Sequence, residues 1–241
     1  MMNFPAEPIV RRKLSDEVFA RLKHLISSGQ MRPGDMMPSE RELMQRFGVG
    51  RPAIREAMQA LAAMGLVAIS HGERAKVMEL TAQSVFRQMD GTAKIMLAKS
   101  ADSLEHLKSA RIFFERGMVR EAAARADAKA IARLRELLAA QRRALGDSDA
   151  FITADMQFHA AVAAMSGNPI YAAVSEAMLG WLKEFHVEML IWSGKETFTL
   201  SEHKEIISCI EARDPDAAEQ AMVRHLERSR GLYAMAQARN G

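Results

Sequence analysis

The sequence has few of the residues that form disulfides, Cys-based metal sites, membrane spans or β-sandwiches. Cys209 is the single cysteine among 241 residues, which excludes an intramolecular disulfide and any Cys-based zinc or iron–sulfur site. No apolar run approaches the ~18 residues that a bilayer span needs, and the N-terminus lacks the apolar segment of a signal peptide. Aromatic residues make up only 6 %, which disfavours an all-β fold. These absences predict a cytoplasmic protein without a membrane partner.

Hydrophobic residues (49 %), charged residues (26 %) and 18 methionines indicate a helix-rich globular protein. The net charge of +3 is unevenly distributed. Residues 1–80 contain 12 Lys and Arg against 9 Asp and Glu, whereas residues 81–241 contain 21 of each kind. The whole excess therefore lies in the first third of the chain, which favours a polyanion partner for this part.

Three helices are predicted after a polar arm at residues 1–13. The first ends near Gly29, and its apolar face consists of Leu14, Val18, Leu22, Leu25 and Ile26. Ser39 and Glu42 form a capping box that starts the second helix, which turns Leu43, Met44 and Phe47 inward. The third begins at Arg51-Pro52, and its buried stripe is Ile54, Ala57, Met58, Leu61 and Met64.

Two short β-prone runs follow these helices. Leu66–Ser70 and Ala75–Leu80 are separated by a hairpin-sized loop that contains His71 and Gly72. Three helices followed by a hairpin is the order of a winged helix-turn-helix, so this domain is predicted over residues 14–80.

The remainder, residues 81–241, is predicted to be an all-α bundle, which makes the fold mainly α. Short breaks divide it into six or seven helices. They lie at residues 100–102, 126–127, 146–148, 167–169, 193–194 and 214–215.

The predicted recognition helix carries two arginines on one face. Arg51 and Arg55 are one turn apart, and Arg is the side chain best suited to grip guanine in the major groove. Arg41, in the first turn of the preceding helix, adds a base or phosphate contact. His71 and Gly72 at the tip of the wing can approach a minor groove or a phosphate. An ordinary solvated basic face is the alternative for any one of these residues; the ordered set favours DNA binding.

Two segments carry a family resemblance. PSERELMQRFGVGRPAIREAMQALAAMGLV, followed by ISHGERAKV, resembles the DNA-binding domain of the GntR family of bacterial transcription regulators, and the helical remainder resembles the ligand-sensing domain of its FadR-type (FCD) subfamily. The resemblance implies a homodimer that binds a palindromic operator and responds to a small metabolite. It also implies that residues matching Arg41, Arg51, Arg55, His71 and Gly72 contact DNA.

Four residues of the second domain could bind a metal. Asp155 and His159 are at positions i and i+4 of one helix, and His203 and His225 lie on two later predicted helices. Asp with three His suits zinc, or nickel or manganese. Spacing alone leaves open that these histidines only cap, pack or face water. The resemblance implies the metal site, because many FCD domains have D-x-x-x-H followed by one His from each of two later helices.

Arg111 matches an arginine that lines the effector pocket in the family and pairs with the acid group of the effector. The alternative is an Arg111–Glu115 ion pair on a solvated helix face. Within the subfamily, the segments FI-x-x-D-x-x-FH-x-x-VA and GNPI are most similar to sialic-acid-responsive repressors. The implied function is therefore a regulator, and not an enzyme, of a sugar-acid catabolic operon.

Other functions stay open at this point. Hexuronates, aldonates and lactate also combine a carboxylate with hydroxyls and would suit a metal beside Arg111. A metal-dependent hydrolase joined to a DNA-binding anchor would use the same four ligands with a bound water. A constitutive architectural DNA binder would carry the same winged helix without responding to any metabolite.

Overall fold

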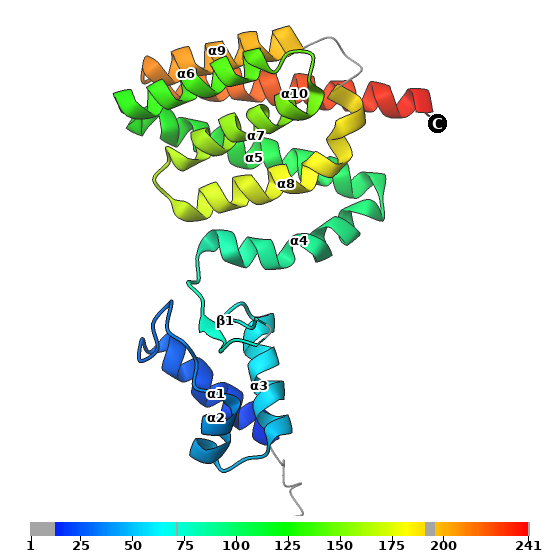
Figure 1. The fold of residues 1–241 in the computed structure, drawn as a ribbon. Helices are drawn as coiled ribbons and strands as arrows, with labels where there is room; N and C mark the ends of the chain where they lie inside the picture. The colour runs from blue at the N-terminus through cyan, green and yellow to red at the C-terminus, as the bar shows by residue number, and fades with distance from the viewer. Residues whose placement is uncertain (1–12, 71, 191–195, 241) are drawn as a thin grey trace, which may run out of the picture. The chain divides into compact units, whose positions relative to one another are not determined.

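The computed structural model describes residues 13–70, 72–190 and 196–240, and these residues form ten helices and one two-stranded sheet (Figure 1). The chain divides into two compact units, Met1–Gln88 and Met89–Gly241. Helix α4 (Ala82–Ala98) crosses the boundary between them. In the described part of the chain, no helix combines the length and apolar character of a membrane span.

The first unit packs three helices around a small apolar core. These are α1 (Leu14–Ser27), α2 (Glu40–Phe47) and α3 (Arg51–Ala63). Their apolar faces meet because each helix repeats its hydrophobic residues at the helical period. The fully buried side chains at the centre are those of Leu22, Met37, Leu43, Ile54 and Leu61.

Local sequence signals set the helix–turn–helix geometry. The capping box forms as predicted: the backbone N–H of Ser39 donates to Glu42 over 2.7 Å, and the N–H of Glu42 donates to the Ser39 hydroxyl over 3.3 Å. Gly48 ends α2 in the left-handed conformation, with φ of +65°, which glycine adopts without a steric penalty. Pro52 lies in the first turn of α3, where no N–H is needed.

The hairpin of the first unit is shorter than predicted. Strands β1 (Val67–Ala68) and β2 (Lys76–Val77) pair antiparallel, with Val67 opposite Val77. Two other expectations are wrong in detail. Leu14 is 60 % exposed and Met64 is 44 % exposed, because each lies at the end of its helix, beyond the part that packs on the core.

Seven helices, α4 and six others, follow the hairpin in the described residues, as predicted. The six are α5 (Ala101–Arg125), α6 (Ala128–Arg143), α7 (Ser148–Ala164), α8 (Pro169–Leu190), α9 (Glu196–Glu211) and α10 (Pro215–Asn240). Ser100, Asp127 and Asp147 cap the helices that follow them, which explains three of the predicted breaks. The predicted break at residues 193–194 lies outside the described residues.

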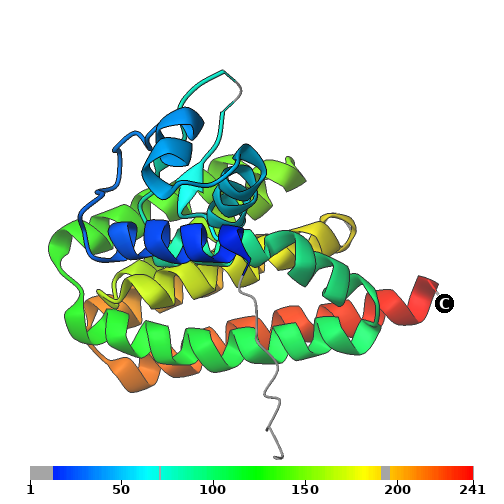
Figure 2. The ribbon, with the colours of Figure 1, turned by 90° about the horizontal axis from the view of Figure 1, so that it is seen from below.

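In the second unit α5 and α10 lie side by side over much of their length (Figures 1 and 2), while α6 packs against α7 and α9. Small residues such as Ala122 and Ala218 are completely buried and let the helix backbones approach closely. Phe158 on α7 is fully buried, and its ring stacks on the ring of His203 on α9 at 4.0 Å between centroids. The core therefore reaches directly to the predicted metal ligands.

Candidate DNA-binding surface and metal centre

Helix α3 has one buried face and one exposed basic face. Ile54 is fully buried and Met58 is 7 % exposed, whereas the side chains of Arg51 and Arg55 are 66 % and 63 % exposed. The face of α3 that the sequence predicts to contact DNA is thus exposed. Arg41 is exposed in the first turn of α2, as expected for a residue that contacts a phosphate or a base.

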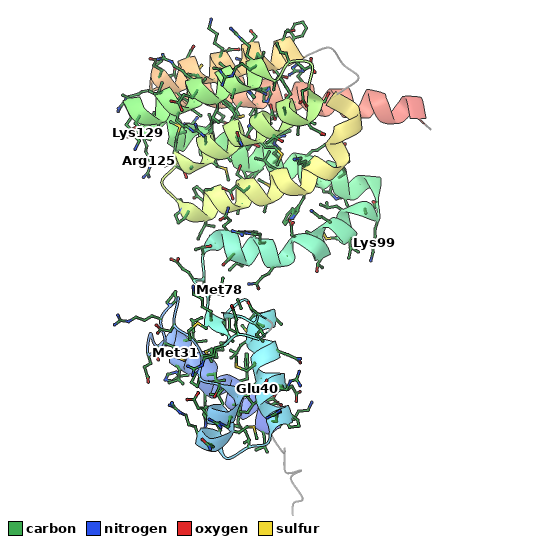
Figure 3. The ribbon with its side chains drawn as sticks, in the orientation of Figure 1. Met31, Glu40, Met78, Lys99, Arg125 and Lys129 are labelled. Atoms are coloured by element: carbon green, nitrogen blue, oxygen red, sulfur yellow. The ribbon has the colours of Figure 1, made fainter. Side chains whose placement is uncertain are left out.

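One carboxylate stands beside both arginines. Glu40, the first residue of α2, has a carboxylate oxygen 3.8 Å from Nε of Arg51 and another 3.8 Å from Nε of Arg55 (Glu40 is labelled in Figure 3). Sequence reasoning did not single out Glu40. All three side chains are exposed, so solvent screens these pairs and leaves the arginines able to move onto DNA.

The wing is described only in part. His71 lies outside the described residues, so its predicted contact stays a prediction. Gly72 has φ of +79°, and a Cβ built on it would meet no atom within 4 Å. A left-handed backbone in open space keeps this peptide accessible to a polyanion, and it favours glycine over residues with a side chain.

The four predicted metal ligands come together inside the second unit, and we call them the metal centre: Asp155, His159, His203 and His225. Each offers one ligand atom, and these atoms all lie within 4.8 Å of one another. Asp155 and His159 come from α7, His203 from α9 and His225 from α10. The side chains of the three histidines are 0–3 % exposed and that of Asp155 is 18 % exposed.

Each imidazole of the metal centre is oriented by a hydrogen bond from its outer nitrogen. The Nδ1 donors and their acceptors are His159 with Glu115 (2.5 Å), His203 with Gln141 (2.8 Å) and His225 with Glu202 (2.7 Å). Carboxylate and amide oxygens only accept, so Nδ1 carries the proton in each ring. The three Nε2 lone pairs therefore face the middle of the cluster.

The Nε2 atoms lie unusually close together for atoms that only accept hydrogen bonds. Nε2 of His225 is 3.3 Å from Nε2 of His159 and 3.4 Å from Nε2 of His203. Three converging lone pairs beside the Asp155 carboxylate repel one another unless a cation lies between them. The donor set, the tautomers and the supporting hydrogen bonds all fit a divalent metal.

Burial favours the neutral form of two histidines of the metal centre, and neighbouring donors keep two supporting carboxylates ionised. Burial lowers the pKa of His203 well below its usual value and lowers that of His225 as well, the latter against the opposing hydrogen bond to Glu202. Burial alone would raise the pKa of Glu115, but Arg111 and His159 outweigh it and hold this pKa at about 2. Neutral imidazoles are the form that binds a metal.

Two sequence profiles match the chain. That of the bacterial regulatory proteins of the gntR family matches residues 14–77, and that of the FCD domain matches residues 106–228. An HTH-type transcriptional repressor NanR from Edwardsiella tarda is 37 % identical over 227 residues, which is 93 % of this chain and 86 % of the relative. The protein of the same name from Cronobacter sakazakii is 38 % identical over 224 residues, or 91 % and 85 %. The chain belongs to the GntR family.

Solved structures agree with this assignment at the level of the fold. Streptococcus agalactiae GntR superposes with a TM-score of 0.66 at 23 % identity, covering 90 % of this chain and 98 % of the other. E. coli McbR/YncC gives a TM-score of 0.52 at 18 % identity, over 94 % and 100 %. As a member of the GntR family with an FCD domain, the chain is a DNA-binding transcription regulator and not an enzyme.

Arg111 lies inside the FCD domain and connects to the metal centre. Its Nε donates to Oε1 of Glu115 over 2.5 Å, while Oε2 of Glu115 accepts from His159. The Arg111–Glu115 pair weighed from sequence therefore forms, but it is buried, with side chains 10 % and 3 % exposed, and not on a solvated face. Glu115 thus joins the arginine predicted for the effector to a predicted metal ligand.

Sequence reasoning missed the residues that orient the histidines. Gln141 is fully buried on α6; it accepts from His203 and donates to Asp155 over 3.0 Å. Glu202 accepts from His225 and from Arg228. A polar residue at a core-facing helix position, such as Gln141 in line with Leu134 and Leu137, was the available signal.

Proposed function

We propose that this GntR-family protein is a repressor of a sugar-acid catabolic operon, and that an effector carboxylate bound at a metal in its FCD domain changes its affinity for the operator. Sialic acid is the first candidate effector. The observation that carries the proposal is the convergence of three buried Nε2 atoms, each belonging to a ring whose Nδ1 is already engaged.

The proposed operator contacts come from the first unit. Arg51 and Arg55 reach base edges in the major groove, Arg41 contacts a base or phosphate, and His71 and Gly72 at the wing meet the backbone or the minor groove. Two copies of the chain would place two recognition helices on the two halves of a palindrome. Because chromosomal DNA is the partner, the proposed place of action is the cytoplasm.

Zinc is the proposed metal, held by Asp155, His159, His203 and His225. Two nitrogens bound to one tetrahedral zinc ion are about 3.3–3.4 Å apart, given zinc–nitrogen bonds of about 2.0–2.1 Å. The Nε2 separations of 3.3 and 3.4 Å support this choice over nickel or manganese, which prefer six ligands. The metal would supply positive charge, and a carboxylate oxygen of the effector would bind it as a fifth ligand.

The chain's own residues would complete recognition of the effector. A carboxylate effector approaching the metal would meet Arg111, whose guanidinium matches the planar acid group. Glu115 shares its two oxygens between Arg111 and His159, so a new anion beside Arg111 competes with Glu115 and alters the support of a metal ligand. An effector regulates only if it binds the operator-competent and the operator-incompetent states unequally.

Fluorescence anisotropy of labelled DNA from upstream of the protein's own gene tests the proposal. We expect selective binding that N-acetylneuraminate changes at fixed salt concentration. If glucuronate, gluconate or lactate changes it instead, the regulator stands and the sialic-acid assignment fails. If no carboxylate changes the binding, the sensor is refuted and a constitutive DNA binder is favoured.

The Arg51→Glu variant separates DNA reading from sensing. We expect operator affinity to fall at least ~100-fold, because a bidentate guanine contact of about 1–3 kcal/mol is lost and a negative charge faces the phosphates. Binding of N-acetylneuraminate, measured by calorimetry, should stay as in the wild type. Arg133→Glu, an exposed position on α6, is the matched control and should leave operator affinity unchanged. Wild-type operator binding by Arg51→Glu would contradict the assignment of α3.

A further inference from the structure

A pocket lies on the surface of the two helices that carry Gln141 and the predicted metal ligand His203. It has a volume of about 510 Å³ and lies between α6 and α9. Its charged lining consists of Arg135, Arg142 and Arg143 from α6, with Lys204 and Glu211 from α9. No ligand of the metal centre lines it, and neither the proposed operator contacts nor the proposed effector site includes it.

Neighbouring residues on each helix divide the two sites. Gln141 and His203 are fully buried and point to the metal centre, whereas the next residues along the chain, Arg142 and Lys204, are exposed and line the pocket. Successive helical residues point about 100° apart, so one helix can serve both faces. The pocket is therefore separate from the metal centre, with which it shares only α9.

The pocket gathers more positive charge than its own residues neutralise. Arg135 donates to both oxygens of Glu211, at 2.7 and 2.6 Å, which accounts for one cation and the one carboxylate. Arg142, Arg143 and Lys204 form no ion pair with any residue in the described ranges. The dipole of α6 favours the two arginines of its last turn, but Lys204 is in the middle of α9. Three cations around one hollow repel one another unless an anion joins them.

We propose that this pocket binds a small phosphorylated metabolite. Arg142, Arg143 and Lys204 would hold the phosphate, and the carbon body would lie on the apolar surface of Leu138 and Ile207. A phosphate monoester carries about −1.5 to −2 charges at pH 7 and offers three acceptor oxygens, so it balances three cations better than a single carboxylate does. The volume lies within the ~300–1,000 Å³ that is typical of small-molecule sites.

Calorimetry on the full-length protein tests this site, with glucose 6-phosphate, fructose 1,6-bisphosphate and inorganic phosphate as probes, and glucose as the uncharged control. Sodium chloride keeps the ionic strength equal in all titrations. We expect at least one sugar phosphate to bind more tightly than inorganic phosphate and glucose not to bind. The double variant Arg142→Gln/Lys204→Gln should weaken that binding at least tenfold.

A matched double variant removes the same amount of charge outside the pocket. Lys129→Gln/Arg133→Gln changes two exposed cations of α6 that do not line the pocket (Lys129 is labelled in Figure 3), and it should bind the sugar phosphate as the wild type does. Unchanged melting temperatures without ligand check that both variants fold.

Three results would overturn the proposal. The first is no binding of any phosphate probe at millimolar concentration. The second is equal loss of binding in both double variants, which would indicate diffuse charge attraction. The third is weaker binding of a random DNA duplex to the pocket variant than to the wild type, with no binding of any sugar phosphate. That result would make this face a DNA contact.

Discussion

Glu115 has two buried partners, so a substitution at this residue tests the hydrogen bonds that support the metal centre. Its carboxylate accepts from His159 and from Arg111 and is 3 % exposed. We expect Glu115→Gln to destabilise the fold by about 3–5 kcal/mol, because a buried arginine loses its counter-charge. Zinc affinity should fall about 10–100-fold, because His159 loses the acceptor that fixes its ring.

Urea unfolding and competition with a zinc chelator measure the two effects of Glu115→Gln. Glu121→Gln is the matched control: it lies on the same helix and pairs with Arg125 at positions i and i+4, but its side chain is 46 % exposed, so we expect it to cost less than about 1 kcal/mol. Wild-type zinc affinity in Glu115→Gln would show that this carboxylate does not support a metal ligand.

The metal centre was only partly predictable from individual residues. Asp155 and His159 share a helix face, so their spacing alone predicted that they meet. Nothing in the spacing joins His203 and His225 to them, and the family resemblance supplied those two. Glu115 is 44 positions before His159, and that pair depends on how α5 packs against α7, which no local pattern encodes.

At the scale of elements, helix ends were predicted well because caps are local. Ser39 is the clearest case, since its hydroxyl and the Glu42 carboxylate satisfy each other's backbone N–H groups. We expect Ser39→Ala to cost about 1 kcal/mol of stability, measured by thermal unfolding of the full chain. Ser27→Ala, at the exposed end of α1, should cost less than half of this. A cost below that of Ser27→Ala would contradict the capping role.

The α5–α10 pair is held in part by an ionic network that acid should weaken. Glu219 on α10 accepts hydrogen bonds from Arg120 (2.6 Å) and from Arg116 (2.8 Å) on α5. These bonds hold the pKa of Glu219 below its usual 4.5. A carboxylate with a lowered pKa in the folded state stabilises it above pH ~4.5 and loses that effect as pH falls further.

Glu219→Gln should therefore be less stable than the wild type at pH 7, and the difference should shrink by about pH 3. Denaturant unfolding at the two pH values measures this. An equal difference at both would show that charge at position 219 contributes nothing to the pairing of α5 with α10.

The length of the two strands was not predictable from the sequence. The β-prone runs 66–70 and 75–80 indicated a hairpin, yet only Val67–Ala68 and Lys76–Val77 pair. Side chains in the rest of these runs, such as Ile69 and Leu80, are more than half exposed and have no core to pack on. Strand length depends on that packing, which the run of residue types does not encode.

At the scale of the whole molecule, the chain separates its two tasks into two compact units. The first carries the exposed arginines of the predicted recognition face, and the second carries the four predicted metal ligands and Arg111. Charge distribution and helix pattern predicted the DNA-reading part and the helical part from sequence. The contact of Glu115 with His159, which joins Arg111 to the metal centre, could come only from the packing of α5 against α7.

We propose that a metal in the FCD domain connects effector binding to operator binding. The most direct test of this proposal is the operator dissociation constant, titrated with N-acetylneuraminate, for protein as purified, stripped of metal by a chelator, and reloaded with zinc. We expect a response in the purified and reloaded protein and none in the stripped protein, with operator binding itself still measurable. An equal response with and without metal would contradict the proposal.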